Sequence, residues 1–237
     1  MALKSKIEWT ENTWNPMTGC TKISEGCQNC YAYKMALRLQ KMGVDKYANG
    51  FDVRVHEECF NDPLNWKKPS RIFVNSMSDL FHKDISVDCI KEIFEIMNKA
   101  TWHTFQVLTK RADRLSEVAN KLSWSDNIWL GVTIENSASI KRIDYLRNIP
   151  AKVKFISFEP LLEDVGKIDF YNIDWAIVGG ESGHQARYID EQWVLNIKKQ
   201  CDEQKVLFYF KQWGGKNKKK TGRLLLGRTW DEMPSSL

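Results

Sequence analysis

Short runs of β-branched and aromatic residues alternate along the chain with longer amphipathic stretches, and this alternation constrains the fold more than any other feature. The short runs are almost continuously apolar, which is typical of strands in a parallel sheet covered by helices. The predicted strands are residues 71–76, 104–109, 128–135, 153–159, 175–179 and 206–211, with a weaker strand around 7–14.

The stretches between these strands carry apolar residues at helical spacing, as Ile90, Ile93 and Met97 do. Six or seven strands alternating with helices predict an α/β fold, a partial or complete parallel (β/α) barrel. An open doubly wound sheet is the alternative, because the periodicity of apolar residues does not distinguish it from a barrel. The predicted helices are 87–100, 111–122, 137–149 and 191–204, with N-terminal caps at Ser86, Asp113, Ser137 and Asp190.

The 237 residues contain no Gly/Ser-rich, Pro-rich or low-complexity linker, so we expect one domain over 1–237. Its C-terminal segment, 216–237, is basic and contributes to a net charge of +5. No apolar run is long enough to cross a bilayer, and the first residues lack the apolar core of a signal peptide. These observations predict a cytoplasmic protein with no membrane partner, in which closely spaced cysteines indicate a metal or catalysis before disulfides.

Polar residues follow six consecutive predicted strands, at the ends where a parallel β/α fold opens its active site. A polar residue at any single strand end is explained by the strand leaving the core there and reaching the surface. Acids, amides and bases at six ends favour an enzyme or a tight ligand site. The glycine-rich run 179–183 either lets a ligand approach the backbone or forms a tight turn. The strand-end residues include Ser76, Asp79, Lys110, Arg111, Glu135, Glu159, Glu181, Lys211 and Gln212.

Three cysteines, Cys20, Cys27 and Cys30, lie within eleven residues and carry the strongest chemical signal. Structural zinc takes four ligands, and only His56 and Cys59 are nearby candidates for a fourth. A 4Fe–4S cluster also takes thiolates, ordinarily four of them. With three thiolates one iron keeps an open position, as radical S-adenosylmethionine (SAM) chemistry requires, because the amino and carboxylate groups of SAM chelate that iron. We therefore favour a cluster over zinc.

Several blocks of the sequence resemble, in order, those of a phage-associated three-cysteine-motif family of radical-SAM-like proteins. The resemblance runs from Trp14 to Pro234 and implies a radical-SAM-like barrel, a 4Fe–4S cluster and SAM as cofactors. Two features depart from the broader radical SAM pattern: six residues instead of three separate the first two cysteines, and Gly-Gly-Glu comes late in the chain. The blocks are TGCTKISEGCQNCYA, FVNSMSDLFH, TFQVLTKR, WLGVTIEN, FISFEPLL, WAIVGGESG, FYFKQWGG and GRTWDEMP.

Strand order suggests roles for individual residues beside the cluster ligands. Ser76 and Asp79 are expected at the amino group of SAM, and Glu135 near its ribose or carboxylate. Tyr31 is expected against the cluster or the adenine, unless it only forms the first apolar turn of a helix. The predicted substrate-binding residues are Lys110, Arg111, Glu159, Glu181, Lys211 and Gln212.

The leading functional hypothesis is a radical SAM enzyme that acts on a nucleobase, a nucleotide or a nucleic acid. An electron donor such as flavodoxin or ferredoxin would reduce its cluster. The alternatives are a radical SAM enzyme acting on a peptide or small metabolite, and a zinc-stabilised nucleic-acid-binding module without catalysis. A hydrolase with Glu159 and Glu181 as acid and base would leave the three cysteines without a role.

Overall fold

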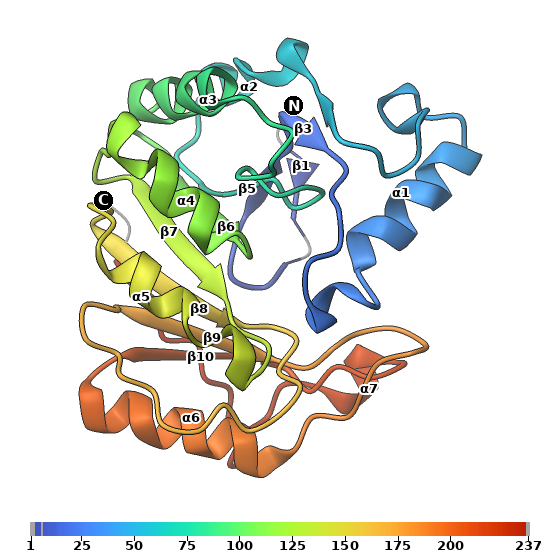
Figure 1. Ribbon diagram of the computed structural model, residues 1–237. Coiled ribbons are helices and arrows are strands. Elements are labelled where there is room, and N and C mark those ends of the chain that lie inside the picture. The colour runs from blue at the N-terminus through green and yellow to red at the C-terminus, as the bar shows by residue number, and fades with distance from the viewer. Residues whose placement is uncertain (1–2, 6, 236–237) are drawn as a thin grey trace.

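A curved sheet of eight strands forms the centre of the computed structural model, which describes residues 3–5 and 7–235. Its strand order is β1-β2-β5-β6-β7-β8-β9-β10, and β1 (Leu3–Lys4) is an antiparallel edge strand. The other seven strands are parallel, and within the described residues the two edges of the sheet do not pair. The chain is therefore an α/β protein with a parallel half-barrel, which confirms the predicted fold class in its partial form. Figure 1 shows most of the larger helices packed around the outside of this curved sheet, whereas α1 (Tyr31–Lys41) lies apart from them on the right of the view.

Each predicted strand and helix has a counterpart in the structure, but two are much shorter than predicted: only Asn12–Trp14 of the predicted strand 7–14 is a strand, and the predicted helix 137–149 contains a 3-10 turn followed by the six-residue helix Arg142–Arg147. The parallel strands are β2 (Asn12–Trp14), β5 (Arg71–Val74), β6 (Thr104–Thr109), β7 (Ile128–Thr133), β8 (Val153–Phe158), β9 (Trp175–Gly179) and β10 (Leu207–Gln212). The larger helices are α1 (Tyr31–Lys41), α3 (Val87–Lys99), α4 (Ala112–Val118), α5 (Arg142–Arg147) and α6 (Glu191–Gln204). The short elements α2 (Asp62–Asn65), α7 (Lys218–Thr221) and the pair β3 (Met17–Thr18) and β4 (Arg54–Val55) complete the chain.

Two of the four predicted helix caps are confirmed. The side chain of Ser86 accepts a hydrogen bond from the first turn of α3, and that of Asp190 does so for α6. The prediction was wrong for Asp113, which lies inside the first turn of α4. It was also wrong for Ser137, because Asn136 caps the preceding turn through a capping box with Ser139.

Alternate residues of each strand face opposite sides of the sheet, and the two sides have different cores. The outer side packs branched aliphatic and Phe side chains against the helices. The inner, concave side is filled by a cluster of aromatic rings, and Trp9 packs into this cluster 4.8 Å from Phe73 between ring centroids. Gly131 of β7 leaves room for one ring, because a Cβ there would lie 2.4 Å from Phe155. The inner cluster comprises Trp9, Phe73, Trp129, Phe155, Trp175, Ile177 and Tyr209.

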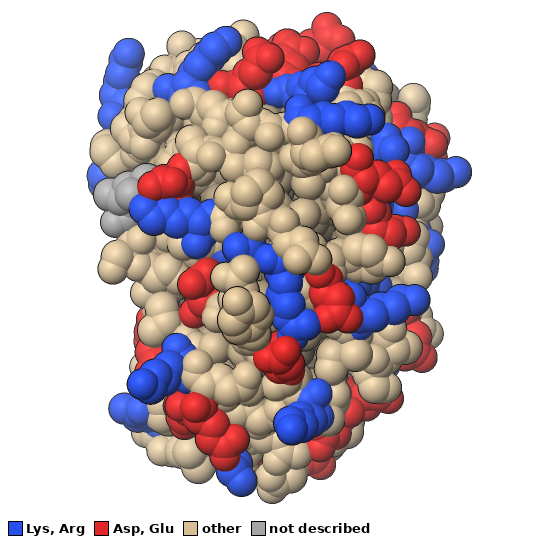
Figure 2. All heavy atoms as spheres, turned by 60° about the vertical axis from the view of Figure 1, so that its left-hand side comes forward, with Lys and Arg blue, Asp and Glu red and all other residues tan. Residues whose placement is uncertain are grey.

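The surface over the outer helices carries both charges. On the face shown in Figure 2, Lys and Arg side chains are interspersed with Asp and Glu. The net charge of +5 is therefore not gathered into one large patch on this face. In the described part of the chain, none of the helices has the length and apolar character needed to cross a membrane.

Truncating the centre of the inner cluster should destabilise the fold. Trp175 is completely buried and its ring lies within 6.3 Å of four other aromatic rings between centroids. We expect Trp175→Ala to lower the free energy of unfolding by about 3–5 kcal/mol, because the cavity left behind cannot close. Urea denaturation followed by far-UV circular dichroism measures the change.

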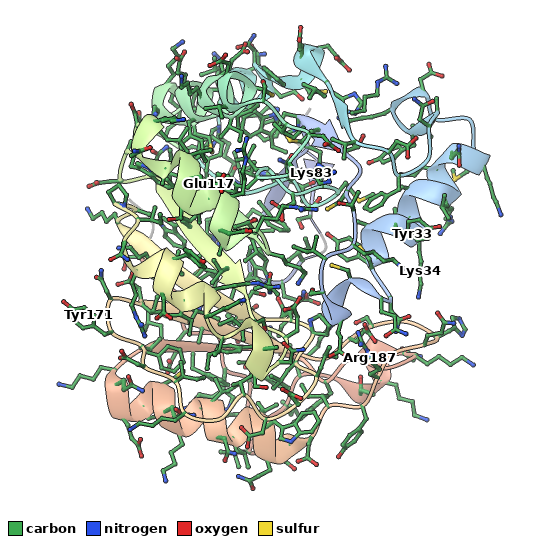
Figure 3. All side chains as sticks on the ribbon, in the orientation of Figure 1. Tyr33, Lys34, Lys83, Glu117, Tyr171 and Arg187 are labelled. Atoms are coloured by element: carbon green, nitrogen blue, oxygen red, sulfur yellow. The ribbon has the colours of Figure 1, made fainter. Side chains whose placement is uncertain are left out.

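Tyr171 offers a matched control, because it is 75% exposed and lies at the left of Figure 3. Tyr171→Ala should change the free energy of unfolding by less than about 0.5 kcal/mol. Equal losses in the two variants would contradict the packing role of the inner cluster.

Candidate functional site

The three cysteines line one cavity beside the carboxyl edge of the sheet. Residues 20–30, here called the cysteine loop, connect β3 to α1. Cys20, Cys27 and Cys30 line a cavity of about 380 Å³, here called the cysteine cavity. Its lining also includes Tyr33 of α1 and Asp52. In Figure 3 the labels Tyr33 and Lys34 mark the part of α1 that follows the loop.

A glycine directly precedes the cysteine loop, because the backbone passes another segment at close range there. Gly19 has φ +83°, and a Cβ on it would lie 2.0 Å from the carbonyl oxygen of Asp52. The N–H of Gly19 donates to the carbonyl of Met77, and its own carbonyl accepts from Ser78 Oγ at 2.6 Å. Cys20 is therefore anchored to the segment that follows β5.

The ends of β5 and β6 hold the next part of the loop. Arg111 Nη2 donates to the hydroxyl of Thr21 at 2.9 Å and lies 3.9 Å from Cys20 Sγ. His82 Nε2 lies 2.8 Å from the same Thr21 hydroxyl. Asp79, which is buried, accepts from Thr109 Oγ1 at 2.7 Å and from the backbone N–H of Lys110 at 3.1 Å. These contacts place Asp79 and Arg111 directly behind Cys20.

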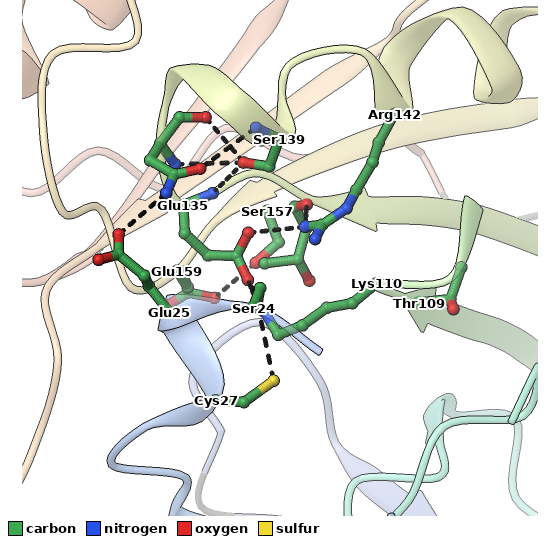
Figure 4. A network of polar contacts seen from close by, with 12 residues as sticks. Ser24, Glu25, Cys27, Thr109, Lys110, Glu135, Ser139, Arg142, Ser157 and Glu159 are labelled. Atoms are coloured by element: carbon green, nitrogen blue, oxygen red, sulfur yellow. Dashed lines mark hydrogen bonds and ion pairs between the residues drawn. The ribbon is translucent and has the colours of Figure 1, made fainter. Parts of the chain in front are cut away.

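Glu135, just after β7, is the centre of a buried polar network (Figure 4). Its side chain has no solvent exposure. Lys110 Nζ lies 2.9 Å from Oε1, and Arg142 Nη1 of α5 lies 2.6 Å from Oε2. Ser24 of the cysteine loop also donates to Oε1, and Gly26 lies so close that a Cβ would be 2.5 Å from the Glu135 side chain. The loop therefore rests directly on this carboxylate.

The charge state of Glu135 follows from these contacts. Burial by itself would raise the pKa of its carboxyl group. The cations Lys110 and Arg142 and the hydroxyl of Ser24 outweigh burial and hold the pKa at about 2, below the ordinary 4.5. Glu135 is therefore an ionised anion at neutral pH, shared by two cations.

The far end of the cysteine loop is held by residues that follow β9. Glu181 accepts two hydrogen bonds from the Arg187 guanidinium, at 2.7 and 3.1 Å, and one from Asn29 Nδ2 at 2.9 Å. Arg187 also donates to the carbonyl of Glu25 in the loop. The pKa of Glu181 is lowered, because hydrogen bonds from Arg187 and Asn29 outweigh the effect of burial. Figure 3 labels Arg187 below the loop.

The thiol of Cys20 lies in a protein environment that favours its protonated form. Burial, followed by the nearby Asp79, raises its pKa from 9.0 to about 11, although Arg111 acts in the opposite direction. A metal ligand must be a thiolate, so metal binding at Cys20 has to displace this proton. The affinity of the site for a metal should therefore rise with pH.

A second polar group lies on the concave side of the half-barrel. Lys211 Nζ pairs with Glu159 Oε1 at 3.0 Å, and Ser157 Oγ donates to Glu159 Oε2 at 3.1 Å. Gly179 lies on the same side of β9 as the inner residues Trp175 and Ile177, and a Cβ on it would lie 2.7 Å from Glu159. Gln212 lies apart from this pair and donates to the carbonyl of Gly180 and to Ser182 Oγ.

The remaining predicted cofactor residues lie beside α1. The hydroxyl of Tyr31 donates to the backbone carbonyl of Ser76, while the Tyr31 ring is half exposed. Ser76 Oγ donates to Asn15 Oδ1 at 3.2 Å. The cofactor roles of these residues, and of Asp79 and Glu135, stay predictions. Each carboxylate oxygen of Asp79 and Glu135 already accepts from a protein donor.

The basic C-terminal segment does not contribute a uniform row of free cations. Arg223 pairs with Asp231 and lies over the ring of Tyr209. Lys216 and Lys220 are exposed, whereas the side chains of Lys218 and Lys219 lie outside the described part of the structure. Among the described side chains of the segment, Arg223 is therefore already paired within the protein, whereas Lys216 and Lys220 are exposed.

Sequence reasoning missed several residues that hold the cysteine loop. Ser24, Arg142 and Arg187 do not lie directly at the end of a strand, so the strand-end pattern has no signal for them. Asn75, directly after β5, is also missing from the predicted site residues; its buried side-chain amide has no hydrogen-bond partner among the described residues, and its φ is +59°. Such a buried, unpaired amide at a strand end is typical of a functional site.

Comparisons with known proteins agree with the fold. A family model described as "Protein of unknown function (DUF5131)" matches residues 4–234. None of the curated proteins matches the chain in sequence. A mutant of spore photoproduct lyase with dinucleoside spore photoproduct has a TM-score of 0.53 at 12% identity, over 86% of this chain and 64% of that one.

Two further structures of the same enzyme are similar. Another mutant has a TM-score of 0.52 at 13% identity, over 76% of this chain and 58% of that one. The complex with dinucleoside spore photoproduct has a TM-score of 0.50 at 12% identity, over 86% and 64%. The chain thus spans less than two thirds of that radical SAM enzyme, and at this identity the likeness concerns the fold.

Removing the charge of Glu135 should change the pH dependence of stability in a defined direction. Because its folded pKa is depressed, Glu135 stabilises the protein above its ordinary pKa of 4.5 and loses this effect as the pH falls towards 2. We expect Glu135→Gln to cost on the order of 2–3 kcal/mol at pH 7. The difference between wild type and variant should narrow between about pH 4.5 and pH 2, as measured by urea denaturation across this range. A constant difference would show that the charge is not what stabilises the network.

Proposed function

The chain belongs to the family described as "Protein of unknown function (DUF5131)", and we propose that this member is a radical SAM enzyme. Its 4Fe–4S cluster is held by Cys20, Cys27 and Cys30. One observation carries the proposal: the three thiols line a single cavity at the carboxyl edge of a parallel half-barrel. Active sites of parallel β/α folds are built at this edge.

The residues of the cysteine cavity fit such a cluster. Within the described residues no group of three His, Cys, Asp or Glu side chains is arranged around a single ion. In a cubane each thiolate binds a different iron, so the three thiols need to line one cavity but do not need to surround a single ion. The cavity volume of about 380 Å³ lies within the range of ligand pockets, roughly 300–1,000 Å³.

Structural zinc is a poorer fit to the same residues. Neither candidate for a fourth ligand lines the cavity. His56 is buried with its Nε2 2.8 Å from Thr18 Oγ1, and Cys59 Sγ accepts a hydrogen bond from Lys46. A closed four-ligand zinc site would require these side chains to leave their partners.

The protein residues around the cavity have distinct proposed roles. When bound, the reduced cluster would supply the electron that cleaves SAM and yields a 5′-deoxyadenosyl radical, with flavodoxin or ferredoxin as donor. Tyr31 and Ser76 would face the cofactor from the start of α1 and the end of β5. Asp79 and Glu135 would act at the cofactor through the groups that they position. Asp52, at the cavity wall, is a carboxylate that suits the ammonium group of SAM.

We place the substrate among nucleobases, nucleotides and nucleic acids. The fold neighbour holds a dinucleoside spore photoproduct, which is a nucleic-acid lesion bound by that enzyme. In this chain the Glu159–Lys211 pair on the concave side supplies polar groups where a base could bind. A peptide or a small metabolite is the alternative substrate, and a product analysis with oligonucleotides distinguishes them.

Each of the three cysteines should be necessary for the cluster. We expect Cys20→Ala, Cys27→Ala and Cys30→Ala each to remove most of the iron and sulfide, while wild-type protein purified without oxygen holds about four iron per chain. Iron and sulfide analysis with electronic absorption spectra measures this.

Cys59, Cys89 and Cys201 provide the controls, because none of them lines the cavity. Their Ala variants should retain wild-type iron. Iron loss in Cys59→Ala would indicate a closed four-cysteine site, and stoichiometric zinc in a colourless protein would defeat the proposal.

A further inference from the structure

A second cavity lies on the other side of the cysteine loop and has a different character. Its volume is about 630 Å³, and Ile23 of the loop forms part of its wall. We call it the basic groove. It lies between the segment after β5, which carries Lys83, and the helices α4 and α5. Figure 3 labels Lys83 and Glu117, which belong to its walls. The groove is lined by six cations, Lys83, Lys110, Arg111, Arg114, Lys141 and Arg142.

Three of these cations already bind partners within the protein. Lys110 and Arg142 share the buried carboxylate of Glu135, and Arg111 holds Thr21 of the cysteine loop. Taking a cation away from buried Glu135 would leave its charge uncompensated, which is strongly destabilising. These three side chains therefore give the groove its positive floor without being free to move.

The other three cations are available to a ligand. Within the described residues Lys141 has no ion-pair partner, and Lys83 makes only a loose, exposed contact with Asp84 at 3.9 Å. Partly buried Arg114 pairs with exposed Glu117 at 3.3 Å, and an ion pair with such access to solvent contributes little to stability. The acids at the wall are Asp113 and Glu117, so cations outnumber acids there.

An aromatic ring adds to the charged wall. Tyr145 of α5 lines the groove and is 40% exposed. Basic side chains that follow a backbone, together with an exposed aromatic ring for a base, are the usual elements of single-strand nucleic-acid sites. A small anion would need no such ring and no groove of this size.

We propose that the basic groove binds the phosphodiester backbone of a single-stranded or locally opened nucleic acid, with Lys83, Arg114 and Lys141 as phosphate contacts and Tyr145 as a stacking surface. This inference rests on the proposed function, whose substrate class it narrows to a polymer. The groove adjoins the cysteine loop through Ile23, so a strand bound in it would pass beside the proposed active site.

The experiment compares two variants with equal net charge. The groove variant is Lys83→Ser, Arg114→Ser and Lys141→Ser, which leaves the contacts of Glu135 intact. The control variant is Lys91→Ser, Lys99→Ser and Lys199→Ser, whose lysines make exposed pairs on α3 and α6. Fluorescence anisotropy with single-stranded DNA and RNA of roughly 12 nucleotides, at several salt concentrations, measures affinity.

We expect the groove variant to bind roughly tenfold more weakly and its salt dependence to become shallower, by about two in the slope of log affinity against log salt, as three lost phosphate contacts predict. The control variant should bind like wild type. Tyr145→Ala should weaken binding without changing the salt slope. Equal binding by groove variant and wild type, or equal losses in both triple variants, would overturn the proposal.

Two further measurements separate the possible failures. ATP and inorganic pyrophosphate should compete only weakly; a protein that binds ATP but no oligonucleotide has a small-phosphate site, which would also overturn the proposal. Iron content is measured on the same preparations. Groove-dependent oligonucleotide binding without an iron cluster would support this inference while the proposed function fails. A protein that holds the cluster but binds no oligonucleotide would overturn this inference while the proposed function stands.

Discussion

The arrangement of the site depends on one buried carboxylate and its two cations. Glu135 has no exposure to water, so its charge is tolerated only because Lys110, Arg142 and Ser24 satisfy both oxygens. These partners come from the end of β6, from α5 and from the cysteine loop. The two ion pairs and the Ser24 hydrogen bond therefore tie the cysteine loop to the end of β6 and to α5. Gly26 adds a steric condition, because only a residue without a side chain can lie against Glu135.

Most polar strand ends serve the cysteine loop, and this explains why so many of them carry acids and bases. Asp79 and Arg111 lie behind Cys20, Glu135 lies under Gly26, and Glu181 holds Asn29. The Glu159–Lys211 pair differs, because it lies on the concave side. The strand ends thus divide into a rim that positions the loop and an inner ion pair on the concave side.

The fold was predictable because it depends on periodicity, whereas the partners of the site residues were not. Apolar runs such as 153–159 identify a buried strand from local sequence alone. The prediction also placed Asp79 and Glu135 at strand ends, where the structure has them. It had no means to find Arg187, whose hydrogen bonds join residues more than 150 positions apart. Whether the barrel closes depends on edge pairing, and this too is a long-range property.

The way the cysteine loop is held bears on how a metal would bind there. In a zinc finger the metal itself supplies the folding free energy, because nothing else positions the ligands. Here Arg111 and Arg187 donate to the loop, and Ser24 of the loop donates to Glu135, so hydrogen bonds tie the loop to three different segments that follow strands of the sheet. The protein's own contacts therefore set the geometry of the loop. Burial raises the pKa of Cys20 to about 11, so part of the free energy of cluster binding would go to deprotonating this thiol. Loss of the cluster should consequently leave the half-barrel folded, which separates the chemistry of this site from the stability of the domain that carries it.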